Sequence, residues 1–372
     1  MPTVYSYGNN FATLGSFNNA SEGRWLLRLG EPGQTAIEIN SGSCSEYTGF
    51  VNFPTTYGGL FPRLLVLNQP SDSVAIRNIQ SQMKLETVAR GTQGLGKRFP
   101  KLTTDLIDVE GLTPASYVSP AGFNTANVSL LLNVVGRTVL YNLPVSHTID
   151  NQQVLQNLSV AGVGIDGSYR APDRLNMTTV NAIMQSELTA SLADPSNFGS
   201  APPYWRWPAV IGDFGYSYIF RAQINYQGYL GITSDQVEYP TYSGGVTIPG
   251  GAAKSAISLP SNTSAIMRFS SKPPVAGFWS VTVYNSTGLL LPNELDRYGL
   301  GDRNNLTYPG GELVYGQASN HPDDSFELLF QSQSIPPPAN WTSNWLPTPA
   351  NGEYFFLNCK LFKSFKSAMS DY

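Results

Sequence analysis

Five charged side chains fall within ten residues of a chain in which charged residues make up only 13%. They are Glu294, Asp296, Arg297, Asp302 and Arg303. A carboxylate can move a proton, and a neighbouring arginine can stabilise an oxyanion, so this spacing permits acid–base catalysis. The same residue types also form structural networks that fix long loops. We take Arg297, Tyr298 and Asp302 as candidate catalytic residues, with a structural pairing of Arg297 and Asp302 as the alternative.

Aromatic side chains with polar neighbours form a second group of candidates. A tryptophan offers a flat apolar face and one N–H donor, which suits core packing and stacking against a flat ligand alike. An arginine on a tyrosine-rich segment can contact a ligand, although it more often forms an ion pair or caps carbonyl groups. The candidate ligand-binding residues are Trp207, Tyr218, Arg221, Trp279, Asn344 and Trp345.

Motifs for metal or cofactor binding are absent from the sequence. Its two histidines, His147 and His321, are far apart and have no Cys or carboxylate at ligand spacing, so no zinc, iron or copper site is predicted. There is no nucleophile elbow, P-loop or dinucleotide fingerprint. The segment His-Pro-Asp-Asp at 321–324 is more typical of a solvated turn than of a catalytic group. We expect chemistry without a cofactor.

Composition indicates strands joined by many turns and excludes two classes of partner. The 372 residues include 35 glycines, 27 prolines, 20 tyrosines and 18 phenylalanines, which favours a β-rich fold. The net charge is -4 with no basic tract, so nucleic acid is not an expected partner. The longest apolar run, 128–143, is interrupted by Arg137 and is too short to span a bilayer. The expected partner is an apolar or aromatic small molecule, and a homodimer is left open.

Eight Asn-x-Ser/Thr sequons predict a secretory-pathway protein, with the cytoplasm as the alternative because residues 1–10 do not form a signal peptide. The sequons begin at Asn19, Asn127, Asn157, Asn176, Asn262, Asn285, Asn305 and Asn340. Both cysteines, Cys44 and Cys359, fall in predicted strands. A buried free thiol is the favoured interpretation for them, with a disulfide as the alternative.

The elements that must position these residues are mostly strands. Alternation and β-branched or aromatic content predict strands over 23–31, 46–53, 60–68, 264–270, 278–285, 311–318, 326–333 and 353–362. The near-continuous apolar run 127–142 predicts a strand in the middle of a sheet. Helical spacing predicts helices over 71–83, within 150–193, and over 213–232.

These elements predict a mainly β fold with helical insertions. The last five strands favour an antiparallel sandwich or jelly roll, and the helical middle separates it from a first set of strands. We expect two β-sandwich or jelly-roll-like modules with helices packed between them. The expected boundaries are 1–145 for the first module, 146–200 for a helical connector and 201–372 for the second module.

The segments 278–303, 310–317 and 344–362 resemble a C-terminal module known as domain of unknown function 1214. The segment 212–231, with its Arg-Ala pair at Arg221, resembles the helix that precedes that module. Residues 7–15 and 44–58 resemble the partner module, domain of unknown function 1254, in its secreted fungal form. Members usually carry an Asn-x-Asp-Thr-Leu-Tyr segment before the stretch matching 7–15, so we expect a shortened first module here.

The resemblance implies a site at the mouth of the second sandwich. There Arg297, Tyr298 and Asp302 would meet Asn344 and Trp345, beside an interior lined by the strand 278–284. If that interior holds a ligand, the indoles of Trp279 and Trp345 should lie near one pocket.

Three functions are compatible with the sequence. The preferred one is a cofactor-independent cyclase, isomerase or lyase acting on an apolar oxygenated small molecule, such as a fungal secondary metabolite. It would orient its substrate in a cavity and use Tyr, Asp or Arg for acid–base or oxyanion assistance. The alternatives are a secreted carbohydrate- or small-ligand-binding protein, and a hydrolase or oxidoreductase with catalytic parts in the missing segment. A deep enclosed cavity would favour the first function, and a shallow aromatic platform the second.

Overall fold

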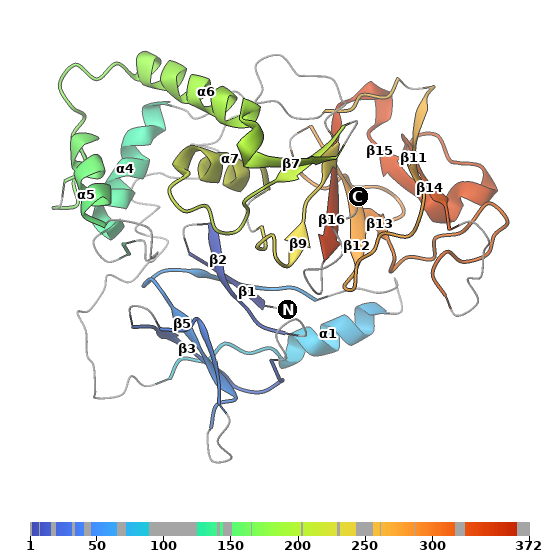
Figure 1. The fold of residues 1–372 in the computed structure, drawn as a ribbon, viewed down its shortest axis with the longest axis horizontal. Coiled ribbons are helices and arrows are strands. Elements are labelled where there is room, and N and C mark those ends of the chain that lie inside the picture. The colour runs from blue at the N-terminus through green and yellow to red at the C-terminus, as the bar shows by residue number, and fades with distance from the viewer. Residues whose placement is uncertain are drawn as a thin grey trace. The chain divides into compact units, whose positions relative to one another are not determined.

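A computed structural model gives the fold, which is mainly β with helical insertions as predicted (Figure 1). It describes residues 2–6, 8–15, 20–31, 34–40, 46–64, 72–88, 125–139, 142–143, 151–164, 166–201, 204–228, 231–242, 256–260, 262–286, 288–316 and 324–362. The chain forms two compact units, each assembled from separate segments. The first comprises Met1–Leu64, Ser81–Leu188 and Gly212–Gly231, and the second comprises Leu65–Gln80, Thr189–Ile211 and Ile232–Tyr372.

The first unit contains two three-stranded sheets. One has the order β2-β1-β6 and is antiparallel. The other has the order β3-β5-β4, in which β3 and β5 are parallel. The bounds are β1 Pro2–Ser6, β2 Asn9–Thr13, β3 Trp25–Leu29, β4 Ile37–Ile39, β5 Gly49–Phe53 and β6 Gly59–Pro62. The strands predicted within 23–31 and 46–53 are confirmed, whereas the strand predicted over 60–68 already ends at Pro62.

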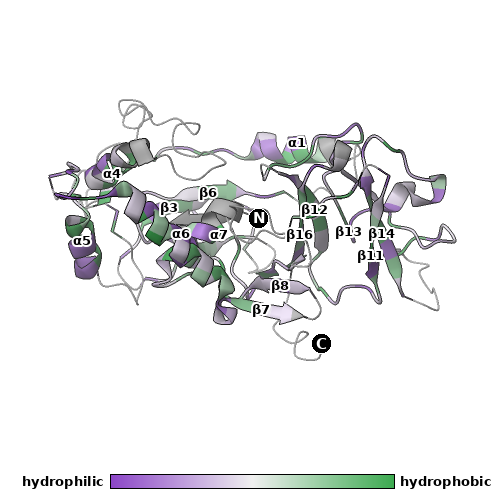
Figure 2. Cartoon of the chain, turned by 90° about the horizontal axis from the view of Figure 1, so that it is seen from above, coloured by the Kyte–Doolittle hydropathy of each residue, from purple (hydrophilic) through white to green (hydrophobic). Residues whose placement is uncertain are grey.

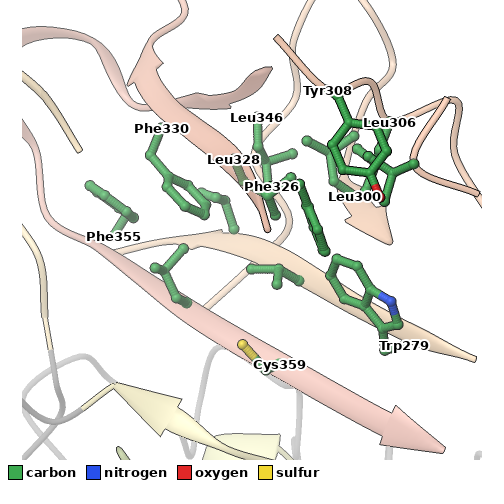
Figure 3. Packing of buried hydrophobic residues seen from close by; sticks show 14 residues of the cluster. Trp279, Leu300, Leu306, Tyr308, Phe326, Leu328, Phe330, Leu346, Phe355 and Cys359 are labelled. Atoms are coloured by element: carbon green, nitrogen blue, oxygen red, sulfur yellow. The ribbon is translucent and has the colours of Figure 1, made fainter. Parts of the chain in front are cut away.

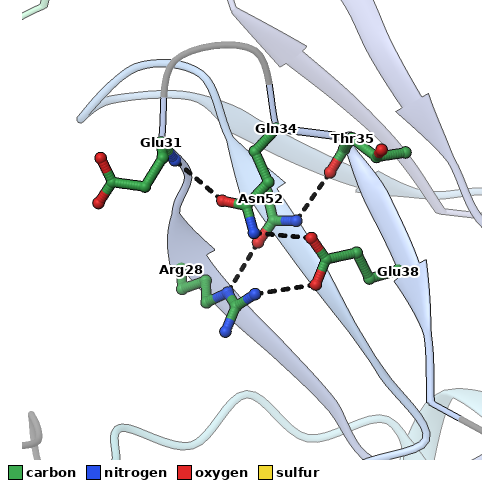
Figure 4. Close-up of polar contacts among 6 residues, drawn as sticks. All are labelled: Arg28, Glu31, Gln34, Thr35, Glu38 and Asn52. Carbon is green, nitrogen blue, oxygen red and sulfur yellow. Dashed lines mark hydrogen bonds and ion pairs between the residues drawn. The ribbon is translucent and has the colours of Figure 1, made fainter.

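A closed polar network crosses the β3-β5-β4 sheet (Figure 4). Arg28 donates from Nε to Asn52 Oδ1 at 2.7 Å, and its Nη2 pairs with Glu38 Oε2 at 3.0 Å. Gln34 donates to the other oxygen of Glu38 at 2.6 Å, and Asn52 donates to the carbonyl of Thr35 at 2.7 Å. Because these polar groups satisfy one another, we interpret the network as structural.

Five helices lie among the described residues. They are α1 Asp72–Gln82, α4 Thr125–Val139, α5 Asn151–Val160, α6 Met177–Ala193 and α7 Tyr218–Gly228. The helices predicted over 71–83 and within 150–193 are confirmed. The helix predicted from residue 213 starts later, because Gly212 and Gly215 form turns with φ of 78° and 50° just before it. Hydrophilic and hydrophobic residues are interleaved along α1 and α5 (Figure 2), and no described helix is long and apolar enough to cross a membrane.

The strand predicted over 127–142 is wrong, because this segment forms helix α4. Its buried positions, Gly136 and Val139, are three residues apart, which is helical rather than alternating spacing. A Cβ on Gly136 would lie 3.1 Å from the carbonyl carbon of Gly167, so the helix approaches another backbone closely at this point. A continuous apolar run cannot by itself distinguish a buried strand from a buried helix.

The second unit holds two sheets that share one core (Figure 3). A four-stranded antiparallel sheet has the order β13-β12-β16-β9, and a three-stranded sheet has the order β11-β14-β15. The bounds are β9 Val237–Glu238, β11 Ser264–Phe269, β12 Trp279–Asn285, β13 Gly299–Gly301, β14 Phe326–Ser332, β15 Trp345–Thr348 and β16 Phe355–Phe362. The core takes one face of each sheet, including Val281 and Val283 from β12 and Leu328 and Phe330 from β14.

Two features of the second unit depart from the sequence prediction. β15 pairs with β14 in parallel rather than antiparallel, after a connection that contains the short 3₁₀ helix η3, Ala339–Asn344. The strand predicted over 311–318 is wrong within its described part, 311–316, which makes only an isolated bridge between Leu313 and Thr307. A turn closed by Gly311 N donating to the Tyr308 carbonyl takes its place.

A second hairpin and two short helical turns complete the described part of this unit. β7 Phe198–Ala201 and β8 Trp205–Pro208 pair antiparallel, and β10 Thr241–Tyr242 joins β8. The 3₁₀ helices η2 Pro195–Asn197 and η4 Ala350–Gly352 precede β7 and β16.

Cys359 lies in the core on β16 as a free thiol (Figure 3). Burial raises its pKa to about 12, so the thiol stays protonated and unreactive at neutral pH. Cys44 lies outside the described residues.

Candidate functional site

Four strand ends meet at one end of the second unit's sandwich. β11 and β14 pair through Phe269 and Phe326, and β12 begins with Trp279, whose ring centroid lies 5.0 and 5.9 Å from the two phenylalanine centroids. β13 ends at Gly301, opposite Ser280. The connections at these ends bring together five titratable side chains, which we call the end cluster: Lys272, Asp302, Tyr308, Tyr315 and Asp324.

Lys272 and Asp324 form the charged half of the end cluster. Lys272 Nζ lies 3.2 Å from Asp324 Oδ1, and the Tyr308 hydroxyl donates to the same oxygen at 3.4 Å. Burial lowers the pKa of Lys272, but its hydrogen bond to Asp324 and the nearby Tyr308 outweigh this effect, and the net pKa is raised. Lys272 is therefore a cation at neutral pH, and it lies 5.8 Å from the ring centroid of Tyr315.

Tyr315 forms the neutral half of the end cluster. Its hydroxyl oxygen accepts a hydrogen bond of 2.9 Å from Trp279 Nε1. Burial raises the pKa of Tyr315 to about 12, against the opposing effect of this hydrogen bond, and nearby Asp302 raises it further. The phenol therefore keeps its proton at neutral pH. Within the described part of the chain, that O–H donates to no acceptor.

Asp302, a predicted site residue, is mostly buried with a side-chain exposure of 14%. Its Oδ1 accepts a hydrogen bond of 3.0 Å from the backbone N–H of Trp279, and its Oδ2 lies 3.5 Å from Arg303 Nε. Burial raises the pKa of Asp302 above its ordinary value, and the Trp279 hydrogen bond and Arg303 only partly offset this.

We expect Asp302→Asn to gain stability relative to the wild type as the pH rises. The folded pKa lies above the unfolded one, so the folded state binds more protons between the two values. The unfolding free energy of the wild type therefore falls as pH rises through this window, whereas asparagine does not titrate. Urea unfolding of both proteins at pH 4 and pH 7 measures the difference. If the stability of Asp302→Asn relative to the wild type were lower at pH 7 than at pH 4, the pKa of Asp302 would not be raised in the folded protein.

Arg297 has different partners from those that the sequence suggested. Instead of pairing with Asp302, its Nη1 donates to the carbonyl oxygens of Thr342 at 2.6 Å and Trp345 at 2.9 Å. Burial lowers the pKa of Arg297. The guanidinium thus ties the loop after β12 to η3 and the start of β15. Tyr298 instead donates its hydroxyl to Asp296 at 3.3 Å.

Asn344 and Trp345, both predicted to bind a ligand, are buried anchors. Asn344 Oδ1 accepts from the N–H and hydroxyl of Thr307 at 2.8 and 3.4 Å, and its Nδ2 donates to the carbonyls of Thr307 and Glu327 at 2.8 and 2.7 Å. Trp345 donates from Nε1 to the carbonyl of Gln331 at 3.1 Å. Their polar groups are engaged within the protein, so both residues position η3.

A small open cleft of about 40 Å³ lies beside η3. We call it the Trp341 cleft. Its lining consists of residues 307–309, Glu327, Asn340, Trp341 and Asn344. Neither Trp279 nor Trp345 contributes to it. Trp279, only 2% exposed, instead packs in the core of the sandwich, where Phe326 points toward it (Figure 3).

The remaining candidates lie elsewhere. Arg221 and Tyr218 come together on α7 in the first unit, where the guanidinium lies 5.6 Å from the ring centroid of Tyr218. Arg221 Nη2 donates to the carbonyl of Gly215 at 2.7 Å, and burial lowers the pKa of Arg221 although Tyr218 and Asp213 favour its charge. Trp207 belongs to β8 in the second unit, half-buried and paired with Gly199.

Sequence reasoning missed Lys272 and Tyr315. Lys272 stands alone in a loop, and Tyr315 was assigned to a strand that does not form, so neither had a local signal. Asp324 was noticed as the end of the 321–324 segment, but residues 321–323 lie outside the described part of the chain, as does His147. In that described part, no group of three His, Cys, Asp or Glu residues is placed to hold a metal ion.

The fold and site define a mainly β protein with a cluster of titratable side chains at one end of its C-terminal sandwich. Residues 255–365 match the family model of DUF1214, described as a protein of unknown function, so the chain contains a DUF1214 domain. The crystal structure of the VPA0106 protein from Vibrio parahaemolyticus is similar, with a TM-score of 0.57 and 17% identity over 97% of this chain and 77% of that one. At this identity the likeness shows the fold alone. No curated protein matches the sequence.

Proposed function

We propose that the protein binds a small hydroxyl-rich ligand of the carbohydrate class at the Trp341 cleft. The observation that carries the proposal is that the cleft contains polar groups without a hydrogen-bond partner among the described residues, on a lining that other hydrogen bonds hold in place. Trp341 is half-buried, and its indole N–H has no partner among the described residues. Glu327 uses Oε1 for Arg268 at 2.6 Å, and its Oε2 has no described partner either.

The cleft wall is held in place before any ligand arrives. Arg297 holds the carbonyls of Thr342 and Trp345, and Asn344 holds Thr307 and Glu327. A rigid aromatic side chain loses little conformational freedom on binding, which favours affinity. Arg297 and Asn344 would therefore position the site. Arg297 does not line the cleft and would not contact the ligand.

The shape of the cleft favours binding over enclosed catalysis. A volume of about 40 Å³ is far smaller than a typical buried ligand pocket, so a ligand would lie across the opening with one face on Trp341. The indole of Trp341 can stack on the apolar face of a sugar ring. The carboxylate of Glu327 and the amide of Asn340, which also line the cleft, can hydrogen-bond to the sugar hydroxyls. This arrangement is the shallow aromatic platform that the sequence analysis associated with a binding protein.

Binding to a panel of oligosaccharides tests the proposal. Cellohexaose, laminarihexaose, xylohexaose, mannohexaose and chitohexaose would be titrated by calorimetry and by tryptophan fluorescence. We expect at least one to bind, and Trp341→Ala to weaken its binding at least about tenfold, or about 1.4 kcal/mol, by removing the stacking face. Tyr354→Ala, an exposed aromatic outside the cleft, is the matched control. Absence of binding across the panel, or unchanged affinity in Trp341→Ala, would refute the proposal.

We further propose that the first unit corresponds to domain of unknown function 1254 in its secreted fungal form, and that the protein passes through the secretory pathway. The resemblance of residues 7–15 and 44–58 to that module supports the first statement. The eight sequons support the second, and a carbohydrate ligand is compatible with an extracellular location.

A further inference from the structure

The end cluster is not explained by the cleft. Its side chains come from two connections of the sandwich, Lys272 from the one between β11 and β12 and the other four from the one between β13 and β14, and they interact through Asp324 and Tyr315. An ordinary ion pair between Lys272 and Asp324 does not require two tyrosines and the indole of Trp279. The cluster combines a cation, a neutral phenol and a carboxylate, which are the groups needed for proton transfer beside a carbonyl.

We propose that the end cluster is a proton-transfer site for β,γ-unsaturated ketones, with Asp324 as the base and Tyr315 as the donor to the carbonyl oxygen. The reaction would be isomerisation to the conjugated α,β-unsaturated ketone. It needs no oxidant, reductant or metal, because the proton that leaves one carbon returns to another.

The isomerisation moves one proton within the substrate. Asp324 Oδ2 removes a proton from the α-carbon, and the electron pair of that C–H bond moves toward the carbonyl oxygen to give a dienolate. The Tyr315 O–H donates a hydrogen bond to this oxygen, and the Lys272 ammonium stabilises its negative charge. Asp324 then returns the proton to the γ-carbon, the dienolate collapses to the conjugated ketone, and both residues regain their starting states.

The geometry assigns each residue to its role. Asp324 is half-exposed at 54%, and among the described residues only its Oδ1 is engaged, by Lys272 and Tyr308, which leaves Oδ2 for a substrate. Trp279 Nε1 occupies a lone pair of the Tyr315 oxygen and thereby directs the O–H away from the indole. A phenol with a pKa of about 12 is a donor and not a base at neutral pH. Lys272 supplies charge to the oxygen, and Tyr308 and Trp279 are positioning residues.

Isomerisation of 3-cyclohexen-1-one tests the proposal directly, because the conjugated product absorbs in the ultraviolet. We expect the wild type to form 2-cyclohexen-1-one faster than buffer and to speed α-proton exchange in D₂O. Tyr315→Phe removes the donor, and we expect it to lower the rate by roughly 100-fold. Asp324→Asn removes the base, and we expect it to lower the rate at least as much.

Three further measurements keep the test decisive. Tyr284→Phe changes a tyrosine of β12 outside the cluster and should leave the rate unchanged. Asp324→Glu keeps a carboxylate and should recover part of the rate, and this rate should fall at acidic pH as the carboxylate is protonated. Melting curves establish that each variant is folded. A wild type no faster than buffer, or a folded Tyr315→Phe as fast as the wild type, overturns the proposal. The assay contains no carbohydrate, so its outcome does not depend on ligand binding at the cleft.

Discussion

Trp279→Ala is expected to lower the free energy of unfolding by about 3–5 kcal/mol, the usual cost of truncating a buried aromatic side chain. The indole is 2% exposed and lies against Phe269, Phe326 and Tyr315, with centroid distances of 5.0, 5.9 and 6.4 Å. Because Phe269 and Phe326 stack on each other at 4.6 Å, they have little room to move into the cavity. Urea unfolding followed by far-ultraviolet circular dichroism measures the loss.

Trp279→Phe separates packing from hydrogen bonding at the same position. It keeps most of the aromatic volume but removes the Nε1–H that Tyr315 accepts. We expect a cost of about 1–2 kcal/mol, and a smaller one when Tyr315 is already phenylalanine, because the acceptor is then absent. Val281→Ala, elsewhere in the same core, is the control for general core damage. A cost below about 1 kcal/mol for Trp279→Ala would mean that the indole is not a packing centre.

The burial of β12 could be predicted from the sequence because its alternation reports directly on the two faces of a strand. Trp279, Val281 and Val283 occupy alternate positions of the strand predicted over 278–285, and all three are buried. Alternation fails where both faces are covered or where the apolar run is continuous. This is why a central strand was predicted where helix α4 forms. Its apolar residues are nearly continuous in the sequence, although its buried positions follow helical spacing.

The candidate site could be predicted only where its residues lie in recognisable segments. The expectation that Arg297 would meet the chain near Trp345 was useful, since its guanidinium does reach the Trp345 carbonyl. Its role differs, because the partners are backbone oxygens and not a ligand or Asp302. The pairing of Lys272 with Asp324 had no local signal. It depends on the register that places Phe269 opposite Phe326, and such long-range register is not written in either segment alone.

The Trp341 cleft and the end cluster are both positioned by strand β14 and by residues 307–308. β14 carries Asp324 just before its start and Glu327 near its start, so one strand positions a residue of each site. Residues 307–308 also connect the two sites, because Thr307 is hydrogen-bonded to Asn344 at the cleft while the Tyr308 hydroxyl donates to Asp324 in the end cluster. Damage to the core should therefore disturb both sites, whereas damage to η3 should disturb the cleft first.

Asn344→Ala is expected to lower the free energy of unfolding by about 3–5 kcal/mol, although it removes only one small polar side chain. Asn344 is 4% exposed and joins η3 to Thr307 and Glu327 through both ends of its amide. The substitution leaves the N–H and carbonyl of Thr307 without this partner, together with the Glu327 carbonyl. Each buried group without a partner costs about 1–3 kcal/mol, less where water can enter from the cleft. Urea unfolding at neutral pH measures the loss.

Asn340→Ala is the matched control, since Asn340 belongs to the same short helix and lines the same cleft but is exposed. We expect it to change stability by no more than about 0.5 kcal/mol. Asn344→Ala should also bind the oligosaccharide more weakly than the wild type at a temperature where it remains folded. The reason is that Asn344 no longer anchors η3, which carries Trp341. The isomerisation rate should change less, because Tyr308 and not Asn344 contacts Asp324. Equal costs for the two asparagines would show that the amide of Asn344 does not hold η3 in place.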